Sequence, residues 1–479
     1  MLIQGLAIAH ALVVIAFSTR ILLREDLSSA ARLAWFMVML FAPYVGVIVY
    51  LLFGEVSLGR TVHRRHDEIF VKLRSMAADS LGNCDENLEG HVETEYQTAF
   101  RAASVDGFET TLGNSAELLP DAATARARLI LDIDNATESV QCMYYIWLDD
   151  NTGQNVAEAL SRAAKRGVVV HAMADGLGSR KFVRSKHWRE MKTAGVHLSV
   201  SLPMKWVVDT ILFSRLDLRN HRKITVIDGR VTWCGSQNCA DPEFRVKARY
   251  APWVDITVRL EGPVVAQNQL LFASDWLLNS GDEVPESFEM KSKEIVGGFP
   301  AQLFADGPTD RRGATPQLFA TLLALARKEV VISTPYFVPN STVLDALCAA
   351  AFRGIDVSMI FPKRNDSWIV AAASHSYYRR LLEHGVKIFE FRDGLLHAKT
   401  FTADRKLSLV GSTNLDLRSF DLNYENDILM RDDKLTQAIF DRQQQYISQS
   451  DSVTLDEVRA WSYPRRIWTN VVATIGPIL

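Results

Sequence analysis

Two copies of one polar pattern, His-x-Lys-x4-Asp, stand out in the sequence. Their internal spacing is the same, and each copy is followed at the same distance by Gly-Ser-x-Asn. The first copy comprises His221, Lys223, Asp228, Gly235, Ser236 and Asn238, and the second comprises His397, Lys399, Asp404, Gly411, Ser412 and Asn414. A match of this length does not arise readily by chance, so the two copies predict one bipartite active site.

These residue types suit the cleavage of a phosphodiester. A neutral imidazole can attack the phosphorus to give a covalent phospho-histidine, and a second, protonated imidazole can give a proton to the departing alkoxide. The lysine, serine and asparagine side chains can neutralise charge on the phosphoryl oxygens. Asp228 and Asp404 complete the candidate catalytic set, although their place at predicted hairpin corners favours a supporting role through turn hydrogen bonds.

This chemistry requires no cofactor. Apart from the two motifs, the sequence has no cluster of His, Cys and carboxylates at metal-ligand spacing. Each motif histidine is also paired with a lysine that would repel a cation. We therefore expect neither a metal nor another cofactor.

Each motif must lie on an extended segment if its histidine and lysine are to act together. Residues i and i+2 of a strand point to the same face, so His221 and Lys223 would project side by side. The stretch from Lys223 to Trp233 predicts a hairpin with Asp-Gly at its turn, and residues 399–410 repeat that shape. A single His-x-Lys could equally be a solvated strand face, but two complete copies favour the active site.

The two halves of the chain match beyond the motifs. In both, a short helical pattern ends at a glycine and an apolar strand follows, at Gly167 and Gly195 in the first half and at Gly354 and Gly385 in the second. This alternation predicts two α/β halves with buried sheets. A duplicated fold relates its motifs by a pseudo-twofold axis, so the two histidines are expected to face each other across one cleft.

The N-terminal segment predicts membrane attachment independently of the motifs. The uncharged run Leu33–Phe53 is long enough to cross a bilayer, which takes about 20 apolar residues, and Pro43 is tolerated within such a helix. Met1–Thr19 is a second, weaker apolar run. A cleaved signal peptide competes there, but the run lacks a basic start and a small-residue cleavage site. We favour a helical hairpin, and the basic residues between Arg60 and Arg74 predict a cytoplasmic catalytic part.

Four segments are therefore expected: a transmembrane helical hairpin at 1–55, a connector at 56–104, and α/β halves at 105–292 and 293–479, the second with a C-terminal tail. The first half carries an extra apolar segment at about 203–218, which could be a helix packed on the core or a lipid-facing lip on the cleft. The tail from Trp461 could be an interfacial helix or could pack against the core.

Charge and cysteine content narrow the class of partner. The net charge of the chain is −3, so the chain lacks the excess of positive charge that is typical of enzymes that act on nucleic acid. The five cysteines are an odd number without metal spacing, which suits reduced thiols in a reducing compartment. We expect no nucleic-acid partner.

With both motif copies, the chain resembles the phospholipase D superfamily, whose signature is this doubled motif. Within it the chain resembles the bacterial cardiolipin synthases over nearly its whole length. The closer resemblance rests on Ala-Pro-Tyr-Val-Gly and Tyr-Leu-Leu-Phe-Gly within residues 42–54, Tyr145-Ile-Trp147, and Thr334-Pro-Tyr-Phe-Val-Pro339.

This resemblance implies a multi-pass enzyme of the bacterial inner membrane that joins two phosphatidylglycerol molecules into cardiolipin and releases glycerol. It also implies that Asp255 and Glu425 orient the histidines, although both could merely end strands. In the expected reaction His221 attacks the first phosphatidylglycerol and His397 protonates the departing glycerol. His397 then deprotonates a hydroxyl of the second lipid, which displaces the phosphatidyl-histidine.

Three other functions are weighed against this one. A hydrolytic phospholipase D would use the same residues with water as the acceptor. A nuclease of the superfamily would more often be basic and would not need membrane helices. A non-catalytic membrane scaffold would be expected to have lost a motif residue, and neither copy has.

Overall fold

The structure is a computed structural model of the chain. It describes residues 2–25, 27, 29–54, 60–77, 80, 81, 88–104, 107–203, 218–280, 285, 288, 290 and 293–474. Contacts between residues divide the chain into an N-terminal unit and a main unit, the latter comprising residues 60–203 and 218–479. Both motif copies belong to the main unit.

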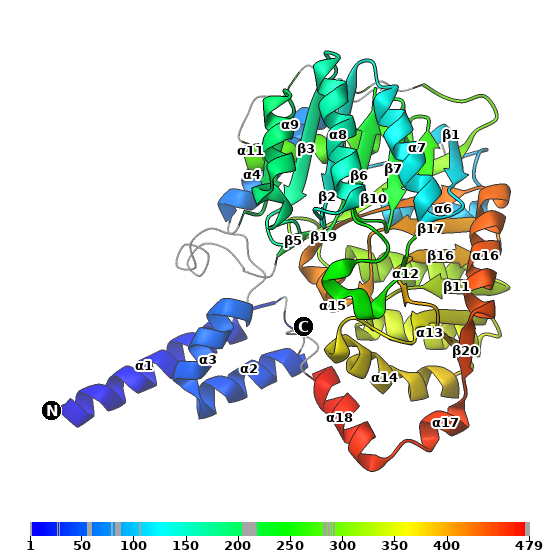
Figure 1. Cartoon of the computed structure of the whole chain (residues 1–479). Helices are drawn as coiled ribbons and strands as arrows, with labels where there is room; N and C mark the ends of the chain where they lie inside the picture. The colour runs from blue at the N-terminus through cyan, green and yellow to red at the C-terminus, as the bar shows by residue number, and fades with distance from the viewer. Residues whose placement is uncertain are drawn as a thin grey trace. The chain divides into compact units, whose positions relative to one another are not determined.

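The N-terminal unit contains helices α1 (Leu2–Leu22), α2 (Ser29–Phe41) and α3 (Pro43–Val49) and a π-helical turn, η1 (Tyr50–Gly54) (blue in Figure 1). The uncharged run that the sequence predicts to cross a bilayer is thus divided. Pro43 begins α3, as expected of a residue that lacks an N–H and suits a first helical turn. Of the helices that the structure describes, none combines the length and apolarity needed for a membrane span.

The main unit is built on one sheet in which two series of strands repeat the same order. The first series runs β4 (His197–Ser201), β3 (Val169–Asp175), β2 (Ser139–Tyr144), β6 (Lys223–Ile227), β7 (Val231–Gly235), β9 (Thr257–Glu261), β1 (Thr111–Leu118). The second runs β14 (Lys387–Phe391), β13 (Asp356–Pro362), β11 (Glu329–Ser333), β16 (Thr400–Ala403), β17 (Leu407–Gly411), β19 (Asn423–Arg431), β10 (Phe299–Asp306).

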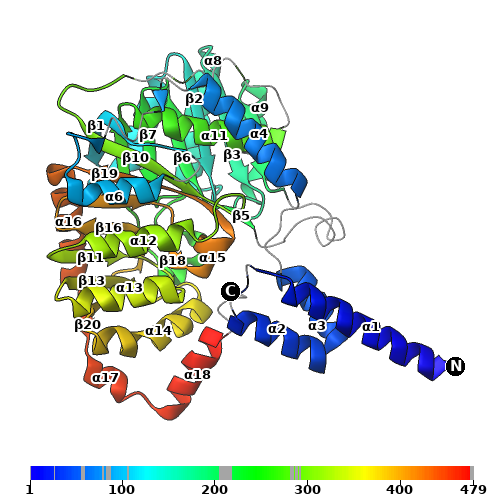
Figure 2. The same ribbon diagram turned by 180° about the vertical axis from the view of Figure 1, so that it is seen from behind.

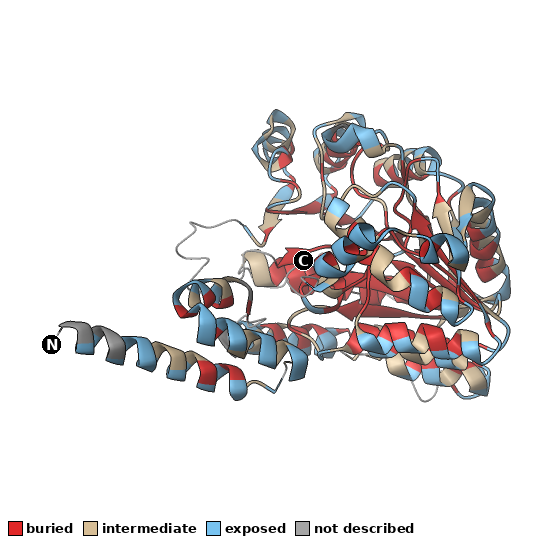
Figure 3. Ribbon diagram, turned by 90° about the horizontal axis from the view of Figure 1, so that it is seen from below, coloured by how far each residue is buried: buried red, intermediate tan, exposed pale blue. Residues whose placement is uncertain are grey.

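The two series join at their equivalent last strands, β1 and β10, which pair antiparallel with Thr111 opposite Ala301. Antiparallel pairing of equivalent strands is what a twofold axis through a sheet produces. The duplicated α/β fold predicted from the sequence is therefore confirmed, and most strands of the joined sheet are buried (Figure 3).

Equivalent helices flank the sheet in both halves. They are α7 (Ala122–Asp134) and α12 (Ala314–Leu325), α8 (Asn151–Lys165) and α13 (Ser341–Phe352), α9 (Lys186–Thr193) and α14 (Trp368–Glu383), and α11 (Val264–Ser280) and α16 (Asp433–Ser448). Helices α11 and α16 share one core with strands of both halves, whereas α7 to α9 and α12 to α14 cover two separate cores. From the connector, α4 (Arg60–Met76) lies along α11 and α6 (Thr94–Ala103) along α12 (Figure 2).

Helix ends follow the local sequence signals. Asp150 and Asn340 accept hydrogen bonds from the first turns of α8 and α13, as side-chain N-caps do. The predicted stops at Gly167 and Gly354 have φ of 93° and 90°, a left-handed conformation that favours glycine just past a helix. Each stop turns the chain into the next strand, β3 or β13.

Short elements complete the main unit. They are η3 (Phe182–Arg184), β5 (Arg219–Asn220), η4 (Arg245–Tyr250), β8 (Trp253–Val254), β12 (Phe337–Val338), β15 (Leu395–Leu396), β18 (Leu415–Asp416), α15 (Leu417–Asp421), β20 (Ser450–Val453), α17 (Leu455–Arg459) and α18 (Tyr463–Thr474). Two of the short pairings cross between the halves: β5 pairs with the start of β19, and β8 pairs with β15. These pairings place the segment that enters each motif beside the other half.

Candidate active site

The structure brings both motif histidines into one cavity of about 600 Å³ in the main unit. His221 enters it directly after β5 and His397 directly after β15. Asn238 and Asn414, from the Gly-Ser-x-Asn tails, also line the cavity. The two motif copies therefore meet at one place, as the repeated spacing predicts.

Each histidine is held by a carboxylate from the opposite half. His221 Nδ1 lies 2.8 Å from Glu425 Oε2, and His397 Nδ1 lies 2.6 Å from Asp255 Oδ1. Because Nδ1–H donates to the carboxylate, Nε2 is the ring nitrogen left to react. This is the placement that an orienting role for Asp255 and Glu425 requires.

The motif serines donate hydrogen bonds to these carboxylates. Ser236 Oγ donates to Asp255 Oδ1 at 2.7 Å, and Ser412 Oγ donates to Glu425 Oε2 at 2.5 Å. The sequence predicts that both serines contact the phosphoryl group. In the structure their hydroxyl groups bind the orienting carboxylates instead. Burial by itself would raise the pKa of Asp255 and of Glu425, but the adjacent histidine and the serine donor bring both below the ordinary range, so both are ionised.

The motif asparagines keep unpaired polar atoms at the cavity. Asn238 Oδ1 accepts from Ile146 N at 3.2 Å, and its buried Nδ2 has no hydrogen-bond partner among the residues that the structure describes. Asn414 Nδ2 donates to Ser419 Oγ at 3.2 Å, and its buried Oδ1 is likewise without a partner in the described part of the chain. A buried polar atom without a partner is costly, so a bound ligand that supplies one is stabilised.

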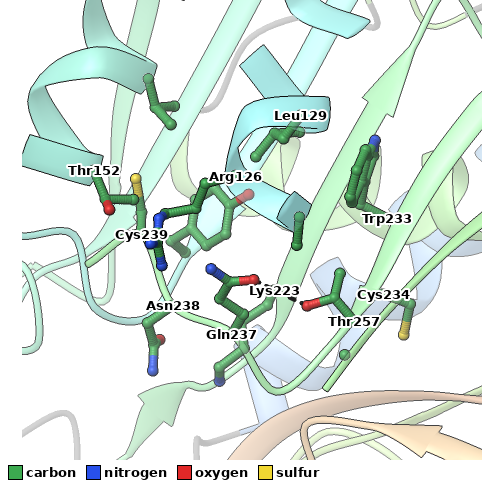
Figure 4. A pocket seen from close by; sticks show the side chains of 14 residues that line it. Arg126, Leu129, Thr152, Lys223, Trp233, Cys234, Gln237, Asn238, Cys239 and Thr257 are labelled. Carbon is green, nitrogen blue, oxygen red and sulfur yellow. Dashed lines mark hydrogen bonds between the residues drawn. The ribbon is translucent and has the colours of Figure 1, made fainter. Parts of the chain in front are cut away.

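A second cavity, of about 30 Å³, adjoins Lys223 and Asn238 (Figure 4). It has room for only one or two water molecules. Beside it Thr257 Oγ1 donates to Gln237 Oε1 at 3.1 Å, the dashed line in Figure 4. Of these two cavities beside the motifs, the one that holds both histidines is the one with room for a ligand larger than water.

Both motif lysines are buried and point back to their own motif. Lys223 Nζ donates to the His221 carbonyl oxygen at 2.6 Å, and Lys399 Nζ donates to the His397 carbonyl oxygen at 2.8 Å. Burial lowers the pKa of Lys223 to about 8. Burial, with repulsion from Lys223, lowers the pKa of Lys399 to about 7. Near neutral pH the site therefore holds cations that titrate within the physiological range.

Both motif histidines are neutral near pH 7. Burial is the main reason why the pKa of His221 and that of His397 fall to about 4, and the lysines lower them further against the pull of the carboxylates. The protonated imidazole that the sequence predicts is therefore absent before substrate binds. A phosphodiester anion beside a histidine raises its pKa, so substrate binding can supply the charged form.

Asp228 and Asp404 are not brought to the histidines. Each stands at the turn of its predicted hairpin with positive φ, 51° and 54°. The intervening strand, at about 3.3 Å per residue, separates each from its motif histidine by roughly 20 Å. Their inclusion in the catalytic set is therefore corrected to the supporting role.

The supporting contacts are equivalent in the two halves. Asp228 accepts from the backbone N–H groups of Thr137, Glu138 and Ser139, with the closest at 2.7 Å. Asp404 does the same for residues 327–329. Each aspartate thus fixes the start of the strand that pairs with its motif strand, β2 or β11.

Sequence reasoning missed most of the cavity lining. The basic side chains are Arg180, Lys181, Arg219, Lys247 and Arg418, and the acidic ones are Asp366 and Asp416. Tyr145 and Tyr336 follow strands β2 and β11, at the carboxyl ends where open α/β sheets bind ligands. The position of both tyrosines after strand ends could have identified them from the sequence. The basic side chains are scattered along the chain and follow no such pattern. The extra segment of the first half lies, from Met204 to Asp217, outside the described residues.

Comparisons with known proteins agree with the duplicated fold. The family model described as "Cardiolipin synthase, PLD-like domain" matches residues 129–276 and 319–446, one match in each half. The model described as "Phospholipase_D-nuclease N-terminal" matches residues 11–55.

Full-length relatives are also similar. Cardiolipin synthase A of Proteus mirabilis is 35% identical over 456 residues, covering 94% of this chain and 93% of the relative. Cardiolipin synthase A of Edwardsiella ictaluri is 35% identical over 475 residues, covering 98% and 96%. The crystal structure of a phosphatidylserine synthase from Haemophilus influenzae covers 81% of this chain and 100% of that one, with a TM-score of 0.61 and 16% identity, which supports the fold alone.

Replacing Asp228 with Ala should lower stability and not the chemistry. The change removes a carboxylate that accepts from three backbone N–H groups, and hydrogen bonds to charged groups are worth about 1.5–3 kcal/mol each, so we expect a loss of at least about 2 kcal/mol in the free energy of unfolding. Thermal unfolding of the purified protein measures it.

The matched control is Asp356→Ala, at an exposed carboxylate 2.7 Å from Lys387 Nζ. An exposed ion pair contributes less than about 1 kcal/mol, so this variant should unfold close to the parent. Equal stability of the two variants would contradict the capping role of Asp228.

Proposed function

The chain belongs to the cardiolipin synthase family with PLD-like domains, and we propose on that premise that it is a phosphatidyltransferase that joins two phosphatidylglycerol molecules into cardiolipin and releases glycerol. One observation carries the proposal. Two neutral histidines, His221 and His397, share one cavity, and each is held at Nδ1 by a carboxylate of the opposite half. Two buried lysines stand beside them.

In the first half-reaction, His221 Nε2 forms a bond to the phosphorus of one phosphatidylglycerol. The bond from phosphorus to the glycerol oxygen breaks, and that oxygen takes the proton of His397. The product is a phosphatidyl-histidine. The positive charge of Lys223 and Lys399 stabilises the negative charge that builds on the phosphoryl oxygens.

In the second half-reaction, a glycerol hydroxyl of another phosphatidylglycerol gives its proton to His397. Its oxygen bonds to phosphorus while the bond from phosphorus to His221 breaks. One phosphodiester is exchanged for another, so no nucleotide is consumed. The balance of the two steps is two phosphatidylglycerol molecules to one cardiolipin and one glycerol.

The carboxylates support this division of roles. Glu425 accepts from His221, Ser412, Ser419 and Asn423, which spreads its charge. Asp255 is bonded to His397 and Ser236. Asp255 has fewer hydrogen-bond donors than Glu425, so its negative charge attracts a proton on its histidine more strongly. His397 therefore suits proton transfer, and His221 suits nucleophilic attack.

We also propose that the N-terminal unit anchors the enzyme in the bacterial inner membrane as a multi-pass hairpin, with the catalytic part in the cytoplasm. The uncharged run Leu33–Phe53, the basic residues that follow it, and the family match at 11–55 support this. The proposed segments are 1–55 for the anchor, 56–104 for the connector, and 105–292 and 293–479 for the halves.

Purified protein given labelled phosphatidylglycerol should form cardiolipin and glycerol in equal amounts, including in excess EDTA. His221→Ala and His397→Ala should each lower the rate by at least about 10²–10⁴-fold, the usual contribution of a positioned acid or base. Product chromatography measures both outcomes.

The control for these variants is His187→Ala, which removes a histidine bonded at 2.9 Å to Asp149 outside the larger cavity. It should retain full activity. Phosphatidic acid as the main product would show hydrolysis in place of transfer, and parent-like turnover in either motif variant would rule out a single bipartite site.

The pH profile of kcat/KM, which reports the free enzyme, should be bell-shaped. Activity should fall below about pH 4 to 5, where protonation of His221 removes the lone pair that attacks phosphorus. It should fall again above about pH 7 to 8, because Lys399 and then Lys223 lose the charge that stabilises the phosphoryl oxygens. Initial rates on a short-chain, water-soluble phosphatidylglycerol measure the profile.

Lys399→Arg should move the alkaline limb to higher pH, because a guanidinium stays charged. Lys387→Arg, at an exposed lysine, should leave it in place. An activity that rises through pH 6.5 and has no alkaline limb below about pH 10 would contradict the assignment.

A further inference from the structure

Helix α18 packs on the second half with one side and exposes an apolar side. Val472 is buried with Val338, Ala372 and Ala373 of the second half. On the other side, large apolar residues are exposed to solvent: Tyr463 by 78%, Ile467 by 63%, Trp468 by 50% and Val471 by 52%. At 3.6 residues per turn these four lie within one side of the helix. One side of α18 therefore packs on the second half, and the side that carries these four residues is left exposed by the residues that the structure describes.

The exposed side of α18 continues to the catalytic cavity. The Trp468 ring stacks on that of Trp368, with centroids 5.9 Å apart and planes 10° apart. Trp368 is 62% exposed and begins α14 directly after Asp366 and Ser367, which line the cavity. In Figures 1 and 2, α18 lies beside the start of α14. A contiguous apolar patch of this kind marks an interaction site.

The charges on α18 indicate what the partner is. Residues 458–474 include arginines and no aspartate or glutamate. Arg465 lies over the Trp461 ring at 3.8 Å, and Arg466 lies 5.8 Å from the Tyr463 ring. Tryptophan, tyrosine and arginine on an amphipathic helix match a membrane interface, where rings sit at the headgroup level and guanidinium groups meet anionic phosphates. A lipid bilayer with anionic headgroups complements both the apolar side and the charge.

We propose that the exposed side of α18, with Trp368, is a docking surface that seats the mouth of the catalytic cavity on an anionic phospholipid bilayer. When the cavity mouth lies on the bilayer, a lipid can move its headgroup toward His221 and His397 while its acyl chains remain in the bilayer. Complete extraction would expose every methylene to water, and the cost grows with each one. The proposal rests on the proposed function only for the identity of the lipid as phosphatidylglycerol.

The test uses the full chain reconstituted in vesicles of phosphatidylglycerol and phosphatidylcholine. Ile467→Cys is labelled with an environment-sensitive fluorophore, and a fraction of the lipid carries a spin label in its acyl chain. We expect a blue shift and strong quenching at position 467. Phe352→Cys is the matched control, because Phe352 ends α13 in the same half and is an apolar residue exposed by 84%. It should stay unquenched, and the unsubstituted chain gives the background from native cysteines.

An unquenched label at position 467 overturns the proposal. A blue shift without quenching means that protein covers the surface. In that case a shift that depends on protein concentration identifies a second copy, and a shift that does not depend on it identifies another segment of the same chain.

A second arm measures the consequence for catalysis. The double variant Ile467→Ser, Trp468→Ser should form cardiolipin from vesicles at least about fivefold more slowly than the parent. On short-chain, water-soluble phosphatidylglycerol its rate should stay within about twofold, which also shows that the variant is folded. Equal loss on both substrates overturns the docking role. Absence of cardiolipin from the parent chain on either substrate would refute the proposed function instead, and the quenching result would stand apart from it.

Discussion

The site depends on the exchange of carboxylates between the halves. His221 is held by Glu425 and His397 by Asp255, so neither half alone contains a histidine with its orienting group. Backbone hydrogen bonds from His221 N to the Tyr424 carbonyl oxygen, at 2.9 Å, and from His397 N to the Val254 carbonyl oxygen, at 2.8 Å, fix the same exchange. These contacts continue the short pairings of β5 with β19 and of β15 with β8, which join the two halves just before each histidine. Contact between the two halves is thus a condition for the orientation of both histidines.

The residue between the first motif's histidine and lysine ties this exchange to the core. Arg222 is fully buried, bonds both oxygens of Asp275 at 2.8 and 2.9 Å, and donates to the Glu425 carbonyl oxygen at 3.2 Å. A buried ion pair gains little net stability, because desolvation offsets the attraction between its charges. Its geometric effect is clearer: Asp275 lies on α11 of the first half, so the pair holds the backbone of Glu425 against that half. We infer that the Arg222–Asp275 pair contributes to the alignment of the two halves and not to the free energy of unfolding.

Sequence patterns predicted what depends on neighbours along the chain. The spacing of apolar residues, the glycines at helix ends and the doubled motif were enough to predict the duplicated α/β fold, the two hairpins and the pair of histidines. The exchange of Asp255 and Glu425, and the contacts of Ser236 and Ser412 with them, depend on pairing between distant segments, which no local pattern records. Pro43 shows the opposite case. Its effect on the uncharged run is local, and helix α2 does end just before it, so the division of that run could have been read from the sequence.

The electrostatics of the site explain how one pair of histidines can act in both of the proposed half-reactions. Two ionised carboxylates and two lysines lie beside two imidazoles whose pKa is about 4, so each histidine begins neutral, with its one proton on Nδ1 and none on Nε2. In the proposed reaction an anionic phosphodiester enters and favours protonation of the histidine that does not attack. When glycerol leaves with that proton, His397 is neutral again and can take one from the incoming hydroxyl. The departing and the entering groups are both glycerol hydroxyls, so by microscopic reversibility one place in the cavity receives both. Direction then follows from the concentrations of the two lipids and glycerol, because the protein holds the same charges before and after the exchange.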